Sequence, residues 1–94
     1  MMFIGAAALE LEITDSLTLK DKRQVVKSLL DRIRSRYNVS AAEVGKLDSR
    51  RFATLAVASV ANRKDFVHKV LETVADFVES EPRAVLTNYT IEIL

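Results

Sequence analysis

The chain contains no cysteine, no tryptophan, one proline and two glycines among its 94 residues. The absence of cysteine excludes disulfide bonds, thiolate chemistry and the usual structural zinc sites. The single histidine, His68, cannot build a conventional metal site alone, and we expect it to lie exposed on a helix. The two glycines, Gly5 and Gly45, cannot form a glycine-rich nucleotide-binding loop. We therefore expect neither a metal ion nor a cofactor.

Long apolar runs and a basic N-terminal region are also missing. The apolar run in residues 1–12 is shorter than the roughly 20 residues of a membrane-spanning helix, and it lacks the basic start of a signal peptide. Hydrophobic residues make up 49% of the chain and charged residues 29%, as is typical of a globular protein. We expect a single cytoplasmic domain over residues 1–94, with no membrane partner.

Periodicity predicts four strands and two helices. The strands cover residues 3–14, 39–44, 52–61 and 85–94, where apolar and polar residues alternate or β-branched residues concentrate. The first helix begins after Thr18 and ends near Asn38, a residue type that tolerates a left-handed conformation. The second helix begins after Asn62 and ends before Pro82. Asp21 and Asp65 lie three residues after the two predicted caps.

The order strand–helix–strand–strand–helix–strand predicts an α+β domain with the ferredoxin-like βαββαβ fold. We expect an antiparallel-rich, four-stranded sheet of order 4-1-3-2 with both helices on one face. Right-handed crossovers predict that strand one runs parallel to strand three and antiparallel to strand four. Phe66 is expected in the buried stripe of the second helix. The predicted core contains Leu9, Leu11, Val26, Leu29, Ile33, Leu55, Val57, Val70, Val74 and Phe77.

The first helix is unusually basic, with seven basic residues between positions 20 and 36 against two acids. Folding requires its apolar stripe but not this excess of positive charge. Cations near a helix N-terminus are locally unfavourable, so their presence suggests phosphate contact together with the backbone N–H groups there. The predicted nucleic-acid contacts within a wedge of roughly 60° are Lys20, Arg23, Lys27 and Arg34. A solvated face without a partner is the alternative.

Two further basic residues, Arg50 and Arg51, precede Phe52 in the predicted hairpin. Basic residues beside an aromatic ring can bind single-stranded RNA, and the alternative is a polar loop tip. We therefore add Arg50 and Arg51 to the nucleic-acid hypothesis. Structured RNA or a ribosomal particle is one predicted partner class, and an acidic protein bound by a homodimeric interaction module is the other.

The helix-free face of the sheet is built mainly from small apolar residues, without a central aromatic residue for stacking bases. Such a face permits close sheet-to-sheet packing, which predicts a homodimer. The predicted dimer face contains Ile4, Ala6, Ala8, Thr54, Ala56 and Ala58. Glu10 and Glu12 are expected on the solvent side, since no third ligand or nucleophile accompanies them. We expect no enzyme activity, no catalytic residue and no small-molecule substrate.

Residues 16–29, which include the run LKDKRQVVKSL, together with residues 37–44, 53–57 and 92–94 resemble the YlxP-like family of small bacterial proteins of unknown function. The resemblance extends over nearly the whole chain. It implies a small ferredoxin-like protein without assigned activity. Genes of this family often lie among those for translation initiation and ribosome maturation factors, so the resemblance also implies a role near the ribosome.

Overall fold

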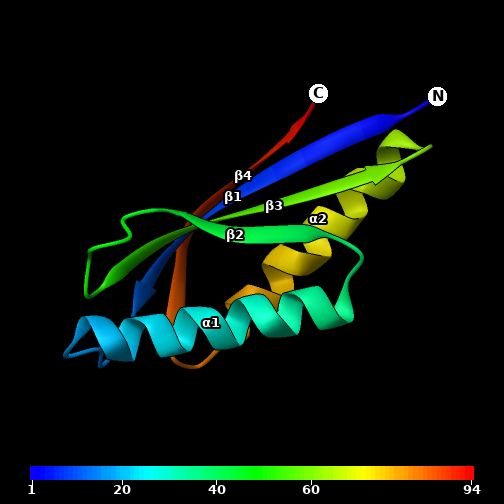
Figure 1. Ribbon diagram of the computed structural model, residues 1–94. Coiled ribbons are helices and arrows are strands. Elements are labelled where there is room, and N and C mark those ends of the chain that lie inside the picture. Colours follow the sequence, from blue (N-terminus) through cyan, green and yellow to red (C-terminus); the bar gives the residue numbers. More distant parts are fainter.

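The computed structural model describes residues 1–94 and confirms the predicted ferredoxin-like fold. The elements are β1 (Phe3–Ile13), α1 (Leu19–Arg36), β2 (Ser40–Gly45), β3 (Phe52–Ala61), α2 (Lys64–Glu79) and β4 (Ala84–Ile93). The strands form one sheet of order β2-β3-β1-β4, which is the predicted order read from the other edge. Both helices lie on one face of the sheet, and the other face is open (Figure 1).

One strand direction differs from the prediction. β1 pairs antiparallel with both β3 and β4, so the prediction that it runs parallel to β3 is wrong. The reason is the order of the connections. The crossover through α1 makes β2 parallel to β1, and the hairpin between β2 and β3 then reverses the chain. β3 lies between β1 and β2 and is antiparallel to both.

The two helices begin differently. Thr18 caps α1 as predicted: the Asp21 amide donates to Thr18 Oγ1 over 3.0 Å, and the Thr18 amide donates to Asp21 Oδ2 over 3.1 Å. The predicted Asn62 cap of α2 is wrong, because Arg63 occupies the cap position and makes no capping hydrogen bond through its side chain. The side chain of Arg63 instead pairs with Asp65 over 2.7 Å. Asp65 therefore still places an acid in the first turn of α2.

The end of α1 also departs from the prediction. Tyr37 closes the helix in an extended conformation, while its amide still donates to the Ile33 carbonyl over 3.0 Å. Asn38 is not left-handed, since Asp15 and Lys46 are the two residues with positive φ. The chain leaves α1 in an extended path that leads directly into β2, so a left-handed residue is not needed there.

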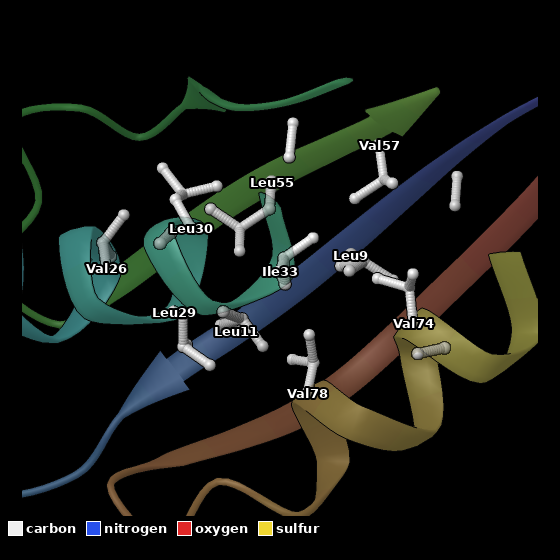
Figure 2. Packing of buried hydrophobic residues seen from close by; sticks show 14 of the residues in the cluster. Leu9, Leu11, Val26, Leu29, Leu30, Ile33, Leu55, Val57, Val74 and Val78 are labelled. Carbon is white, nitrogen blue, oxygen red and sulfur yellow. The ribbon is translucent and has the colours of Figure 1, made fainter. Parts of the chain in front are cut away.

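The core lies between the sheet and the two helices, and Figure 2 shows its close packing around Leu29, Ile33 and Leu55. Eight of the ten predicted core residues are buried, whereas Val70 and Phe77 are half-buried. The prediction for Phe66 is wrong, because this side chain is 56% exposed. The N-terminal half of α2 points away from α1 (Figure 1). α1 therefore does not cover the first turn of α2, where Phe66 lies.

Candidate nucleic-acid interface

Three of the seven cations of α1 contact side chains of other elements, although one of them, Arg36, is still exposed to solvent. Lys22 is fully buried, although its position near the helix N-terminus suggested phosphate contact. Its ammonium group donates to Glu43 Oε2 of β2 over 2.7 Å and to the Lys46 carbonyl over 3.0 Å. Lys22 therefore joins the start of α1 to β2 and to the hairpin that follows it.

Arg32 and Arg36 lie on the other flank of α1 and contact α2. Their guanidinium carbons lie 5.6 and 4.8 Å from the centroid of the Phe77 ring, within the range of cation–π interactions. The Tyr37 ring meets the same Phe77 ring edge-on at 5.9 Å. These contacts hold the two helices together where they approach most closely (Figure 1). Part of the positive charge that looked superfluous in the sequence therefore serves packing.

The other four cations of α1 are exposed and form the outward cation row, which we define as Lys20, Arg23, Lys27 and Arg34. Lys20 and Arg23 have no acidic side chain within ion-pairing distance, whereas Lys27 and Arg34 approach Asp31 at 2.7 and 3.8 Å. The structure thus places the four predicted residues on one exposed helix face, with a single acid among them.

The acid within this row is held ionised by its neighbours. The hydrogen bond from Lys27, together with the charges of Lys27 and Arg34, keeps the pKa of Asp31 below its ordinary value. Arg34 also donates to the Ala41 carbonyl over 2.6 Å, which fixes its guanidinium near the edge of β2. Exposed ion pairs of this kind contribute little to stability, so these cations can exchange the carboxylate for a phosphate.

A capping box takes up part of the hydrogen-bonding capacity at the N-terminus of α1. The Thr18 side chain already accepts the hydrogen bond of one first-turn amide, and the Asp21 carboxylate lies beside the positive end of the helix. The capping box therefore leaves fewer first-turn amides for a phosphate, and the cooperation of these amides with lysine stays a prediction. The outward cation row carries most of the exposed positive charge of α1.

The hairpin between β2 and β3 provides a second group of cations beside the start of α1 (Figure 1). Arg50 is exposed and has no acidic partner, whereas Arg51 is bound to Glu12 of β1. Lys46 also belongs to this group of cations. Its Nζ atom lies 5.8 Å from the centroid of the Phe52 ring, and the guanidinium carbon of Arg51 lies at the same distance. Sequence reasoning placed Phe52 at the start of β3 but did not count it among the residues of the open face, where Phe52 is 41% exposed.

The open face of the sheet contains all six predicted dimer residues. Ile4, Ala6 and Ala8 of β1 lie directly opposite Val60, Ala58 and Ala56 of β3, and Thr54 lies opposite Glu10. Glu10 and Glu12 are on this face as predicted, each half-buried beside a basic side chain. The face thus has an apolar end near the chain termini and a charged end near the hairpin.

A buried carboxylate lies at the opposite side of α1, between this helix and the start of β4. The Glu81 side chain is 2% exposed and accepts hydrogen bonds from Arg83 and Arg32. Arg83 also donates to Ser28 of α1 over 3.2 Å. The side-chain and backbone hydrogen bonds of Arg83, followed by the one from Arg32, lower the pKa of Glu81 to about 2. Sequence reasoning treated residues 79–82 only as the end of a helix.

This ion cluster predicts a pH-dependent contribution to stability. Because the pKa of Glu81 is lower in the folded than in the unfolded chain, its contribution is present above about pH 4.5 and is lost as the pH falls toward 2. In urea unfolding, Glu81→Gln is expected to cost about 2–3 kcal/mol at pH 7 and much less at pH 3. The exposed Glu79→Gln variant is the control. An equal cost of Glu81→Gln at both pH values would contradict this assignment.

His68 is exposed as predicted and lies 3.0 Å from Glu72 one turn later in α2. The structure brings together no group of three His, Cys, Asp or Glu side chains that could hold a metal ion. Neither helix is long and apolar enough to cross a membrane.

The fold and this surface define a class: a small ferredoxin-like α+β domain with a basic outer helix and an open sheet face. Comparison with known proteins identifies the family within this class. Residues 4–91 match the family described as "Protein of unknown function (DUF503)". The chain is also 35% identical over 79 residues to the "Uncharacterized protein YlxP" of Bacillus subtilis (strain 168), covering 84% of this chain and 86% of that protein. The chain belongs to the DUF503 family, and the YlxP-like resemblance is confirmed.

Proposed function

We propose that this protein is a non-enzymatic, cytoplasmic accessory protein that binds structured RNA, such as a ribosomal particle, through the outward cation row of α1. The observation that carries the proposal is the separation of cations within one helix. Lys22, Arg32 and Arg36 are occupied by contacts with the rest of the fold, whereas four other cations remain exposed with one acid among them. Of those four, only Arg34 contacts another element of the fold, through its hydrogen bond to the Ala41 carbonyl.

The dimensions of the row suit contacts with several phosphates. At a rise of about 1.5 Å per residue, Lys20 and Arg34 are separated by about 21 Å along the helix axis. Arg50 adds an exposed cation in the same hairpin as Lys46, whose carbonyl accepts a hydrogen bond from Lys22 near the start of α1. Contacts with three to four phosphates give a log–log slope of affinity against salt of roughly −2 to −4.

An acidic protein is the competing partner, since it would also be attracted by this surface. The salt dependence separates the two partners. RNA binding releases condensed counterions and weakens steeply between ~50 and ~200 mM salt, whereas a protein interface with apolar anchors weakens less. None of the exposed large apolar side chains of the chain belongs to α1, which favours the polyanion.

Charge reversal of the row is expected to abolish binding. Wild-type protein is cosedimented with ribosomal subunits and with free ribosomal RNA at ~50 and ~200 mM salt. The Lys20→Glu, Arg23→Glu, Lys27→Glu triple variant is expected to lose at least about 100-fold in affinity, because three attractive contacts become repulsive. The matched control is Arg63→Glu, Lys64→Glu, Lys69→Glu, which changes the net charge equally on the exposed surface near the start of α2.

Each alternative outcome has a distinct meaning. Equal losses in the two triple variants would show that net charge, not the outward cation row, controls the association. Unchanged association in the α1 variant would exclude this helix as the contact. No binding of the wild type to subunits or to free RNA would favour the acidic-protein partner.

A further inference from the structure

The open sheet face combines a bulky apolar end with a hollow lined by small residues. Met2, Ile4 and Val60 are 67%, 37% and 59% exposed and project at the end near the chain termini. Next to them, a shallow groove of about 150 Å³ lies over Ala6, Ala42, Ala56 and Ala58. A second groove of about 570 Å³ connects to it, since both contain Ser40 and Ala58. The protruding side chains and the hollow therefore belong to one continuous surface.

The open face carries three carboxylates, and two of them are paired within the chain. Glu10 lies 3.4 Å from Lys46, and Glu12 is bound to Arg51, so the charged end carries two internal ion pairs. Both carboxylates oppose a polyanion at this face, in contrast to the exposed cations of α1 on the helix-covered side of the sheet (Figure 1). The ion pairs let the charged end approach an identical surface without like-charge repulsion. The third carboxylate, Glu92 of β4, lies opposite Ala6, is exposed and has no basic partner, so the face as a whole disfavours a polyanion. The charge distribution therefore fits a second copy of this chain better than a nucleic acid.

The area of the face is compatible with a stable dimer. Strands about 4.8 Å apart with a rise of about 3.3 Å per residue give the four-stranded sheet a flat projection of roughly 600 Å². The solvent-accessible area of such a side-chain-covered surface is larger than its projection. Standard interfaces bury about 800 Å² on each partner. A second copy that covered most of the open face would come close to that area.

We propose that two copies of this chain associate through their open sheet faces, with Ile4 and Val60 of each copy seated over the alanine-lined hollow of the other. An isologous interface requires this reciprocity, in which the contact made by one copy is repeated by its partner. The pair Ala6 and Ala58 lies midway between the protruding end and the residues Ala8 and Ala56. The two-fold axis therefore passes near Ala6 and Ala58. This packing leaves the outward cation rows of both copies free, and it does not depend on RNA binding.

Sedimentation velocity over about 1–100 μM protein tests the association. The wild type is expected to be a dimer at the upper concentrations. Ala8→Arg and Ala58→Arg, each at an exposed position, are expected to weaken dimerisation by about 100-fold or more, because each charge would be buried twice in the symmetric interface. Thr73→Arg, on the exposed side of α2, is the matched control and is expected to remain dimeric. Circular dichroism verifies that each variant is folded.

Oxidative cross-linking tests the position of the axis, and it is simple here because the chain has no cysteine. Ala58→Cys is expected to form a disulfide-linked dimer under mild oxidation at concentrations where Thr73→Cys stays monomeric. A wild type that remains monomeric at about 100 μM would overturn the proposal. A dimer that resists both arginine substitutions, or that Ala58→Cys does not cross-link, would place the interface elsewhere and would also overturn it.

Discussion

Replacing Lys22 with methionine is expected to lower the free energy of unfolding by about 3–5 kcal/mol, the usual cost of removing one partner from a buried ion pair. The methionine keeps most of the aliphatic volume of lysine, so the loss reports mainly on charge and hydrogen bonding. Glu43, whose side chain is 15% exposed, and the Lys46 carbonyl would both lose their donor. The partial exposure of Glu43 places the expected cost near the lower limit.

Replacing the other partner of the pair, in Glu43→Leu, is expected to cost more than Lys22→Met. The ammonium group of Lys22 would then have no exposed surface and no counter-charge. Removing both partners together in Lys22→Met, Glu43→Leu is expected to cost less than the sum of the two single losses. This double-mutant cycle isolates the pair, with an expected interaction of about 2–3 kcal/mol. Urea unfolding followed by circular dichroism measures each term, provided that the m value stays constant.

The control for this cycle is Lys20→Met, which makes the same chemical change two residues earlier on an exposed lysine. Its expected effect is within about 0.5 kcal/mol. If Lys22→Met and Lys20→Met had equal effects on stability, Lys22 would be a surface residue and the geometry of the hairpin described above would be wrong.

Adding a single methyl group at Gly5 is expected to destabilise the fold by about 1–3 kcal/mol, although Gly→Ala usually favours a strand. A Cβ atom at this position would lie 2.5 Å from Val67 Cγ1, 2.9 Å from Ile93 Cδ1 and 3.0 Å from Leu71 Cδ1. Gly5 has no positive φ, so the effect is steric and not conformational. The larger Gly5→Val substitution is expected to cost more than Gly5→Ala.

A compensating substitution tests this explanation. Val67→Ala removes the atom that lies nearest to the added Cβ, so Gly5→Ala and Val67→Ala together are expected to cost less than the sum of their separate effects. Chemical unfolding of the four proteins provides the comparison. A gain in stability from Gly5→Ala, of the 0.4–1 kcal/mol that a restricted unfolded chain would provide, would show that α2 does not lie this close to β1.

Much of the fold was predictable from local patterns in the sequence. The small and β-branched residues of positions 52–61 predicted β3 with its observed bounds, and Thr18 with Asp21 predicted the start of α1. Both signals depend on residues a few positions apart, whose relative geometry is set by the secondary structure itself. The Asn62 cap and the left-handed Asn38 were predicted by the same type of reasoning and are wrong, because the tertiary path of the chain near them needs neither.

The helix periodicity also placed the four members of the outward cation row on one face, without information about any other element. It could not show that Lys22 is buried, because the partners of Lys22 lie 21 and 24 residues away along the chain. The position of a residue on a helix fixes the direction of its side chain. Whether that side chain reaches water or a carboxylate depends on the elements that pack beside the helix.

The sequence by itself therefore determined the elements, their order and the apolar faces, since these depend on composition and short-range periodicity. It also carried the resemblance to the family, through residues 16–29, 37–44, 53–57 and 92–94. The tertiary structure decided which charges stabilise the fold. It brought Glu81 of the α2–β4 connection to Arg32 of α1, 49 residues away. It also placed α2 against Gly5. These contacts join segments distant in the chain, so they exist only once the sheet and both helices have packed together.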